Sequence, residues 1–365
     1  MGSTPQTDMH DLDAVSGRLM QSFLGTIDTF AIYLGLRLGW YESLTREGPA
    51  TSAQLAARTK ANERYAREWL EQQAASGLLS VDDAGADAAA RVFRIAPGLA
   101  EALTDRDSAY YLAPLVRSFA PLLRQIDPLV EAYRTGGGVS WAQFGDEMRA
   151  AQGEANRPFF LQSFTRDVLP AIAHVHARLL ADPPARVADI ATGMGWSSIG
   201  LATAYPKIAV DGYDIDGPSV AQAQRNAEAA GVSERVRFQA RDAGDPALAG
   251  RYDLVLVTEA LHDMARPVDV LRTMHRLVAQ GGTVLVVDER TADAFTAPAE
   301  DMERLFYGYS LLCCLPDGMS QQPSAATGTV MRPATLRSYA TEAGFRAVEP
   351  LDVEAGFFRV YRLVV

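Results

Sequence analysis

Cysteine is scarce in this chain of 365 residues: the two copies, Cys313 and Cys314, are adjacent. Two neighbouring thiols cannot build a disulfide framework, and they cannot supply the four ligands of a structural zinc site. The sequence also lacks a Cys-rich cluster and a His-Glu-x-x-His motif, which are common metal-binding patterns. The sequence therefore predicts no metal site.

Long apolar runs are missing as well. Stretches such as Leu254–Val257 and Thr283–Val287 fall far short of the roughly 18 residues that a membrane helix needs. Residues Met1–Asp13 contain no basic cluster followed by an apolar run, so we expect no secretory signal. These absences predict a cytoplasmic protein without a membrane partner.

Positive charge is in deficit. The chain has 34 Lys and Arg against 45 Asp and Glu, a formal net charge of −11, and its only lysines are Lys60 and Lys207. Proteins that bind nucleic acid through its phosphates usually present a basic face, so we expect no nucleic-acid partner. A content of 48% hydrophobic and 22% charged residues is typical of a folded globular protein, and the length suits about two domains.

The first part of the chain predicts a mainly helical domain. Met20–Leu38 has helical spacing of its apolar residues, and Thr51 and Asn62 are suitable N-caps for two further helices. Two short strand-like runs follow, Leu78–Val81 and Val92–Ile95. Helix, turn, helix and hairpin in this order indicate a winged helix, and we assign residues 14–150 to this domain.

The second part alternates strands and helices, which predicts a parallel sheet flanked by helices. We assign residues 151–365 to this α/β domain, with the boundary in a helical stretch between 150 and 185. The expected strands, of which the last two form a terminal pair, are Val187–Ala191, Ala209–Tyr213, Val236–Gln239, Leu254–Val257, Thr283–Val287, Arg346–Leu351 and Phe357–Val365.

A glycine-containing loop follows the first of these strands. Gly193 and Gly195 let the backbone turn tightly and approach a ligand, and the next helix offers free N–H groups there. Asp214 ends the second strand, where an acid can bind a ribose diol. Asp242 follows the third strand, where it can reach an adenine edge.

Asp189, Gly193 and Gly195 resemble the motif of the class I S-adenosylmethionine-dependent methyltransferases, an acid followed by Gly-x-Gly-x-Gly, with Ala191 in place of the first glycine. The resemblance implies a Rossmann-like sheet of seven strands with the last one antiparallel, S-adenosylmethionine as cofactor and S-adenosylhomocysteine as product. It also implies that Asp189 lies near the methionine part of the cofactor. The resemblance further implies cofactor contacts near the ribose, near the adenine and at the end of the fourth strand. The residues at these places are Asp214, Ile215, Asp242, Ala243 and Thr258. A nicotinamide enzyme is the alternative, but its third glycine would fall at Ser198 and it does not explain the terminal strand pair.

The fourth strand runs into a Glu-Ala-Leu-His-Asp-Met segment containing His262 and Asp263, and the fifth ends at Asp288 and Glu289. If these strands are neighbours, the imidazole and a carboxylate converge at the edge where ligands bind. The segment is similar to that of plant-type small-molecule O-methyltransferases. That resemblance implies His262 as the base that deprotonates an acceptor hydroxyl and Asp288 as its partner, with Glu289 as the competitor. We expect Asp263 to orient the backbone or to cap the next helix.

The closest resemblance is to bacterial and mycobacterial winged-helix methyltransferases of unassigned substrate, through Gly138-Val139, Asn156-Arg157-Pro158 and the segment around His262. It implies a homodimer formed through the N-terminal domain, with Phe23, Phe30 and Trp40 as exposed interface candidates. DNA binding is disfavoured because the second helix of the motif offers Arg64 and Arg67 against three glutamates.

The insertion Asp301–Met331 is expected to cap the acceptor site, because this region does so in the family. We predict an apolar or aromatic acceptor in a pocket formed by Phe160, Met302, Phe306 and Tyr307, although an apolar stripe of this kind equally fits a hydrophobic core. The sequence thus predicts O-methylation of a small molecule. The alternatives are a carbon or nitrogen acceptor, and a cofactor-binding or regulatory protein without methyl transfer.

Overall fold

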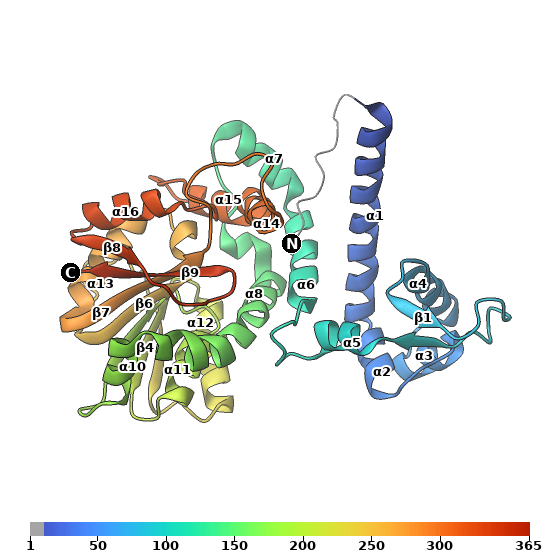
Figure 1. The fold of residues 1–365 in the computed structure, drawn as a ribbon, viewed down its shortest axis with the longest axis horizontal. Coiled ribbons are helices and arrows are strands. Elements are labelled where there is room, and N and C mark those ends of the chain that lie inside the picture. Colours follow the sequence, from blue (N-terminus) through green and yellow to red (C-terminus); the bar gives the residue numbers. More distant parts are fainter. Residues whose placement is uncertain (1–10) are drawn as a thin grey trace. The chain divides into compact units, whose positions relative to one another are not determined.

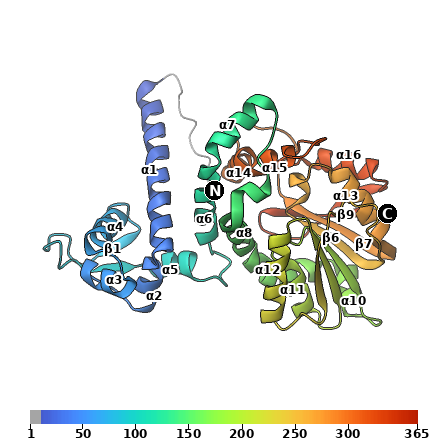
Figure 2. The same cartoon turned by 180° about the vertical axis from the view of Figure 1, so that it is seen from behind.

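The computed structural model describes residues 11–365, so the prediction for Met1–Asp13 falls largely outside the described residues. The chain divides into two compact units, Met1–Phe119 and Ala120–Val365, shown in Figure 1 and from behind in Figure 2. This division lies earlier than the boundary between 150 and 185 that the sequence suggests. The reason is that α8 (Trp141–Pro158), which we assigned mostly to the N-terminal domain, packs against helices of the second unit. The boundaries 14–150 and 151–365 stay a prediction.

The first unit has the winged-helix order that the sequence predicts. Thr51 and Gln54 form a capping box at one helix start, and the Asn62 side chain accepts from Arg64 N–H at the next. The two strands pair antiparallel, with Leu79 opposite Ile95. The elements are α1 (Leu12–Arg37), α2 (Trp40–Arg46), α3 (Ser52–Thr59), α4 (Glu63–Ala75), β1 (Leu79–Val81), β2 (Phe93–Ile95), α5 (Pro97–Thr104) and α6 (Ala113–Arg124), which crosses the division.

Trp40 belongs to the core of this unit, and the prediction that it is exposed is wrong. Its side chain is 2% exposed, its ring lies 4.7 Å from that of Trp69, and its Nε1 donates to Thr59. Phe30 is half-buried and Phe23 is exposed. An indole at the start of a short helix can bury its ring while its N–H keeps a partner, which periodicity alone does not reveal.

Helix α1 is the one described helix long and apolar enough to cross a membrane, by length and composition alone. The expectation that no segment is long and apolar enough for a membrane helix is therefore wrong. Only 17% of its apolar window is buried within the described chain. Core helices and signal sequences meet the same criterion, so the finding is weak support for a membrane span.

The second unit is an α/β sandwich whose sheet has the order β5-β4-β3-β6-β7-β9-β8. Pairing is parallel except at β9, which is antiparallel to both β7 and β8, so the predicted fold class is confirmed. The strands are β3 (Arg186–Ile190), β4 (Ala209–Asp214), β5 (Val236–Ala240), β6 (Tyr252–Thr258), β7 (Val278–Glu289), β8 (Ala347–Pro350) and β9 (Phe358–Val364).

Helical layers cover both faces of this sheet (Figures 1 and 2). One core includes Val175, Ile199 and Val220 from three helices on one face, and the other includes Leu271 and Leu336 from two helices on the opposite face. The helical elements of the unit, in chain order, are α7 (Ile126–Thr135), α8, η1 (Phe159–Val168), α9 (Leu169–Ala171), α10 (Ala173–Leu180), α11 (Trp196–Ala204), α12 (Gly217–Ala229), η2 (Leu261–Asp263), α13 (Pro267–Leu277), α14 (Asp301–Tyr309), η3 (Ser310–Cys314), α15 (Leu315–Met319) and α16 (Pro333–Glu342).

The strand register sets the place of the candidate site. Ile190 pairs with Val257, and Val257 pairs with Val286. The loops that follow β3, β6 and β7 consequently leave the sheet at one edge, because parallel strands point their carboxyl ends the same way.

Candidate functional site

The loop after β3 has the backbone conformation that its glycines suggest. Gly193 and Gly195 have φ of 54° and 81°, and Ala191 also takes a left-handed φ of 55°. Alanine thus keeps the conformation of the glycine that it replaces, at a cost of roughly 1–2 kcal/mol. A Cβ at Gly195 would lie 2.6 Å from Phe238 Cζ, whereas one at Gly193 would meet no atom of the described chain within 4 Å. The space beside Gly193 is therefore open to a ligand.

Asp189 holds this loop in place. Its Oδ2 accepts hydrogen bonds from the hydroxyls of Thr192, Ser197 and Ser198, which ties the loop to the first turn of α11. Burial raises the pKa of Asp189, and the three hydroxyl hydrogen bonds oppose that shift. These contacts identify Asp189 as a positioning residue, and its contact with a cofactor stays a prediction.

Asp214 lies at the end of β4 beside the same loop. Its Oδ2 accepts the N–H of Gly193 at 2.7 Å, and its Oδ1 accepts the N–H of Asp216 at 2.8 Å. Burial raises the pKa of Asp214 to about 6, against the effect of these two hydrogen bonds. A carboxylate has about four acceptor positions, so two remain for donors such as the hydroxyls of a ribose. Ile215 follows and is 63% exposed.

The remaining predicted cofactor residues lie on the loops after β5 and β6. Asp242 accepts from Gly244 N–H at 2.7 Å and from Arg266 at 3.1 Å, and Ala243 packs against the core around α13. Thr258 ends β6 and is buried, and among residues 11–365 its hydroxyl has no hydrogen-bond partner. The fold brings these residues to the carboxyl ends of neighbouring strands, while their roles stay predictions.

Arg149 is a residue that sequence reasoning missed. It lies on α8, is 8% exposed, and forms a bidentate pair with Asp216 at 2.7 and 2.9 Å. The Asp216 side chain caps α12 by accepting the N–H of Ser219. The backbone N–H of Asp216 in turn donates to Asp214 Oδ1. No local pattern predicts this contact, because the two partners are 67 positions apart.

His262 and Asp288 converge as the neighbouring strands predict. His262 is 2% exposed, and its Nδ1 lies 2.7 Å from Asp288 Oδ1. Glu289 Oε2 lies 3.1 Å from the same nitrogen. Burial by itself would lower the pKa of His262, but the carboxyl groups of Asp263, Asp288 and Glu289 hold that pKa well above its usual value.

The pKa values of Asp288 and Glu289 shift in opposite directions. Burial favours the neutral form of both, yet the charge of His262 and hydrogen bonds from Glu289 and His262 lower the pKa of Asp288. Burial and the charge of Asp288 instead hold the pKa of Glu289 well above its usual value. Two adjacent buried carboxyl groups disfavour double ionisation, and the opposite shifts favour the charge on Asp288 and the proton on Glu289.

Asp263 does not cap the next helix, and that expectation is wrong. The N-cap of α13 is Arg266, whereas Asp263 Oδ1 lies 3.0 Å from Nε2 of His262. The short helix η2 has turned the Asp263 side chain back onto the neighbouring imidazole. An acid therefore lies at each nitrogen of the ring.

Glu259, just before η2, contacts helix α8, which the motif alone did not suggest. It has a left-handed φ of 51°, and such strain in a non-glycine residue often accompanies a functional site. Burial raises the pKa of its carboxyl group to about 7, although a hydrogen bond from Asn156 of α8 opposes the shift. Asn156 thus connects α8 to the segment that carries His262.

The four predicted pocket residues separate into two groups. Phe160 is 7% exposed and packs with Phe159 and Phe164 in the core. Three others lie on α14: Phe306 is buried, Met302 is 45% exposed, and the Tyr307 hydroxyl accepts from Arg332. Phe160 therefore contributes to packing under α11, and a role at an acceptor site stays a prediction for all four.

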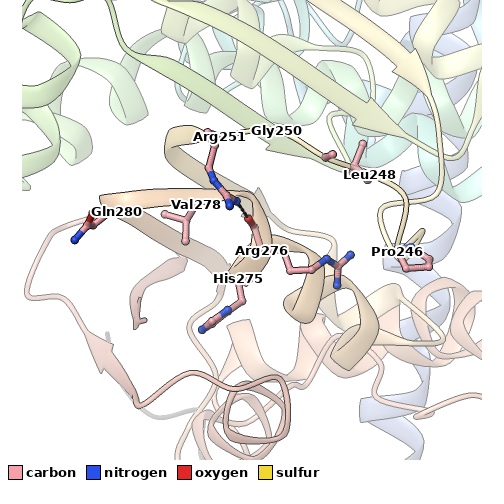
Figure 3. Close-up of a pocket in the computed structure, with 9 residues that line it drawn as sticks. Pro246, Leu248, Gly250, Arg251, His275, Arg276, Val278 and Gln280 are labelled. Atoms are coloured by element: carbon pink, nitrogen blue, oxygen red, sulfur yellow. Dashed lines mark hydrogen bonds between the residues drawn. The ribbon is translucent and has the colours of Figure 1, made fainter.

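A cavity of about 780 Å³ lies at the opposite edge of the sheet, next to the starts of β6 and β7. It is lined by polar residues that include Arg251, His275, Arg276 and Gln280. Figure 3 shows the Arg251 guanidinium turned toward the carbonyl of Arg276, so Arg251 caps the end of α13. None of the predicted site residues lines this cavity.

The residues at the carboxyl edge fit an S-adenosylmethionine site. The open space at Gly193 admits a ligand close to the backbone, and the free N–H groups of α11 begin beside it. Asp214 keeps acceptor positions for a diol, and the His262–Asp288 pair lies at the end of the adjacent strands. A base held next to a methyl-donor site can deprotonate an acceptor.

We expect Arg149→Met to weaken S-adenosylmethionine binding about 2- to 30-fold, a range typical of residues that act through a contact network. The physical reason is that Asp216 loses its ion pair with Arg149. That ion pair fixes Asp216 in the position from which its backbone N–H donates to Asp214. Isothermal titration calorimetry measures the change in Kd.

The matched control is Arg178→Met, which removes an ion pair to Asp253 at 2.8 Å away from the loop. Both variants should lower the melting temperature, but only Arg149→Met should change Kd. Equal affinity of Arg149→Met and the unmodified protein would contradict the positioning role.

Comparison with known proteins agrees with this geometry. Residues 181–325 match the family described as methyltransferase domain, and residues 27–104 match the Rv2258c-like winged HTH domain. The demethylmenaquinone methyltransferase of Thermus thermophilus is 34% identical over 110 residues, which are 30% of this chain and 49% of that protein. The chain thus spans about half the length of this curated relative.

Two solved structures are similar in fold over nearly their whole length. The mitomycin 7-O-methyltransferase MmcR has a TM-score of 0.72 and 23% identity, covering 96% of this chain and 98% of its own. Human N-acetylserotonin methyltransferase in complex with S-adenosylmethionine has a TM-score of 0.69 and 19% identity, covering 100% and 99%. The chain therefore combines an Rv2258c-like winged helix-turn-helix domain with a methyltransferase domain of the S-adenosylmethionine-dependent class, on the fold of small-molecule O-methyltransferases.

Proposed function

We propose that this protein transfers a methyl group from S-adenosylmethionine to a hydroxyl group of a small apolar or aromatic molecule, with His262 as general base. The observation that carries the proposal is the buried 2.7 Å contact between His262 Nδ1 and Asp288 Oδ1. It supports a ring whose Nδ1–H is fixed by a carboxylate. In its neutral form, reached above the raised pKa of His262, that ring has a lone pair at Nε2 that can take the acceptor proton.

Each residue has a defined task in this proposal. S-adenosylmethionine, when bound, supplies an electrophilic methyl group. Asp214 binds the ribose hydroxyls, and the open backbone at Gly193 admits the cofactor. Nε2 of His262 takes the hydroxyl proton as the acceptor oxygen attacks, and the charge that the ring gains is stabilised by Asp288 and Asp263. Alignment of acceptor and donor supplies a further part of the rate.

We expect His262→Ala to lower methyl transfer to a hydroxyl about 10²- to 10⁴-fold, the usual contribution of a positioned base, with little change in cofactor Kd. The assay uses methyl-labelled S-adenosylmethionine and a panel of phenols that includes N-acetylserotonin, the acceptor named for the human relative. Calorimetric binding of S-adenosylmethionine comes first, because failure to bind would overturn the whole proposal.

His174→Ala is the control, since His174 is exposed on α10 and lies outside the proposed machinery. Near-normal turnover of His262→Ala would contradict the general-base role and favour a carbon or nitrogen acceptor, which depends more on alignment. Cofactor binding without turnover of any acceptor in the panel would favour a binding or regulatory protein.

The proposal includes a homodimer formed through α1. Leu19, Phe23 and Ile27 are 54%, 63% and 55% exposed, and their four-residue spacing puts them on one face of the helix. An apolar patch of this kind usually marks an interaction surface. A second copy of the chain would bury it.

We expect the protein to sediment as a dimer at micromolar concentration and the double variant Phe23→Asp/Ile27→Asp to sediment as a monomer, because charge on this face disfavours its burial. Tyr65→Asp is the control, at a position that is 74% exposed on α4, and it should remain dimeric. A monomeric unmodified protein, or a dimeric double variant, would contradict this assignment.

A further inference from the structure

Three potential metal ligands of different chemistry lie close together, and one of them is the candidate base itself. His262 and Asp263 belong to η2, and Cys314 ends the π-helical segment η3. One ligand atom from each of the three lies within 4.8 Å of the other two. No spacing motif relates Cys314 to the other two, so the fold alone brings the set together.

The orientation of His262 suits a metal ligand. Its Nδ1 contacts Asp288 at 2.7 Å, while its Nε2 faces Asp263 Oδ1 at 3.0 Å. Histidines that bind a metal through one nitrogen almost always donate the other N–H to a carboxylate or carbonyl, which fixes the ring. Asp288 supplies that outer contact here.

The two other ligands lie on segments that pack against each other. Asp263 Oδ1 is buried and lies 3.0 Å from His262 Nε2, the nitrogen that would bind the same ion. Gly328 N–H donates to the carbonyl of His262 at 3.1 Å, and a Cβ at Gly318 would lie 3.0 Å from the carbonyl of Asp263. The insertion that carries Cys314 is thus packed directly on η2.

The donor set selects the class of ion. A nitrogen, a carboxylate oxygen and a thiolate together suit Zn²⁺, which three protein ligands bind with a fourth position left open. Ligand atoms around a tetrahedral zinc ion are about 3.5 Å apart, so the three atoms, all within 4.8 Å of one another, adjust their spacing when an ion binds. The alternative set of His262, Asp288 and Glu289 contains no thiol and would need the nitrogen that already contacts Asp288.

We propose that His262, Asp263 and Cys314 bind a thiophilic divalent cation of the zinc type. On binding, the thiol of Cys314 gives its proton to solvent and its sulfur joins the ion, while Nε2 of His262 donates its lone pair to the same ion. A bound ion therefore occupies the lone pair that a general base needs, and metal binding and base function exclude each other. This inference departs from the absence of a metal site that the sequence predicts.

The test is a titration of the full-length protein, freed of metal by a chelator, with Co²⁺ as the spectroscopic substitute for Zn²⁺. We expect a thiolate-to-cobalt charge-transfer band in the near ultraviolet that saturates at one ion per chain and is reversed by Zn²⁺. Cys314→Ser should abolish the band. Asp288→Asn should raise the Kd for Co²⁺ about 10- to 100-fold, as loss of an outer-shell contact usually does.

Cys313→Ala is the matched control, because Cys313 is the adjacent thiol and belongs to neither cluster of ligand atoms. It should keep the band, and S-adenosylmethionine binding by each variant reports a folded protein. No band in the unmodified protein would overturn the inference, as would a band that survives in Cys314→Ser. Either result leaves cofactor binding unaffected, so this inference and the proposed methyl transfer fail separately.

Discussion

The parallel pairing of β3, β6 and β7 is the constraint on which the candidate site depends. Because Ile190, Val257 and Val286 are in register, the glycine loop, the segment of His262 and the acids Asp288 and Glu289 emerge at one edge. The side chains of His262 and Asp288, 26 positions apart, thus come within hydrogen-bond distance. A slip of one residue in a strand would turn its side chains to the opposite face and disperse the site.

Burial of charge at this edge has a large energetic cost, which the contacts of the site offset. Asp189, His262, Asp288 and Glu289 are each at most 5% exposed. Removing one partner of such a buried pair typically destabilises a protein by about 3–5 kcal/mol, because the other charge remains without compensation. The hydroxyls around Asp189 compensate its charge, and the raised pKa of Glu289 favours its neutral form.

Helix α8 connects the parts of the second unit that the site needs. Arg149 reaches Asp216 near the cofactor loop, Asn156 reaches Glu259 near the base, and the N–H of Trp141 donates to Asp317 of the insertion. Burial, together with the charge of nearby Asp263, raises the pKa of Asp317 to about 7. Gly145 interrupts the helix with a φ of 77°, so the segment that contacts the insertion and the segment that holds Arg149 are separate helical pieces.

The sequence by itself determined the fold class, the order of strands and helices, the glycine loop and the convergence of His262 with Asp288. The strands, helices and loop follow from local periodicity and caps. The convergence follows from the rule that parallel strands end together, once the family resemblance makes the fourth and fifth strands neighbours. Tertiary structure alone decided that Trp40 is buried, that Asp263 faces Nε2, that Arg149 holds Asp216, and that Cys314 lies beside the imidazole. The physical reason is that such contacts join side chains through packing of separate elements, and neither side-chain rotation nor helix placement leaves a periodic signal in the chain.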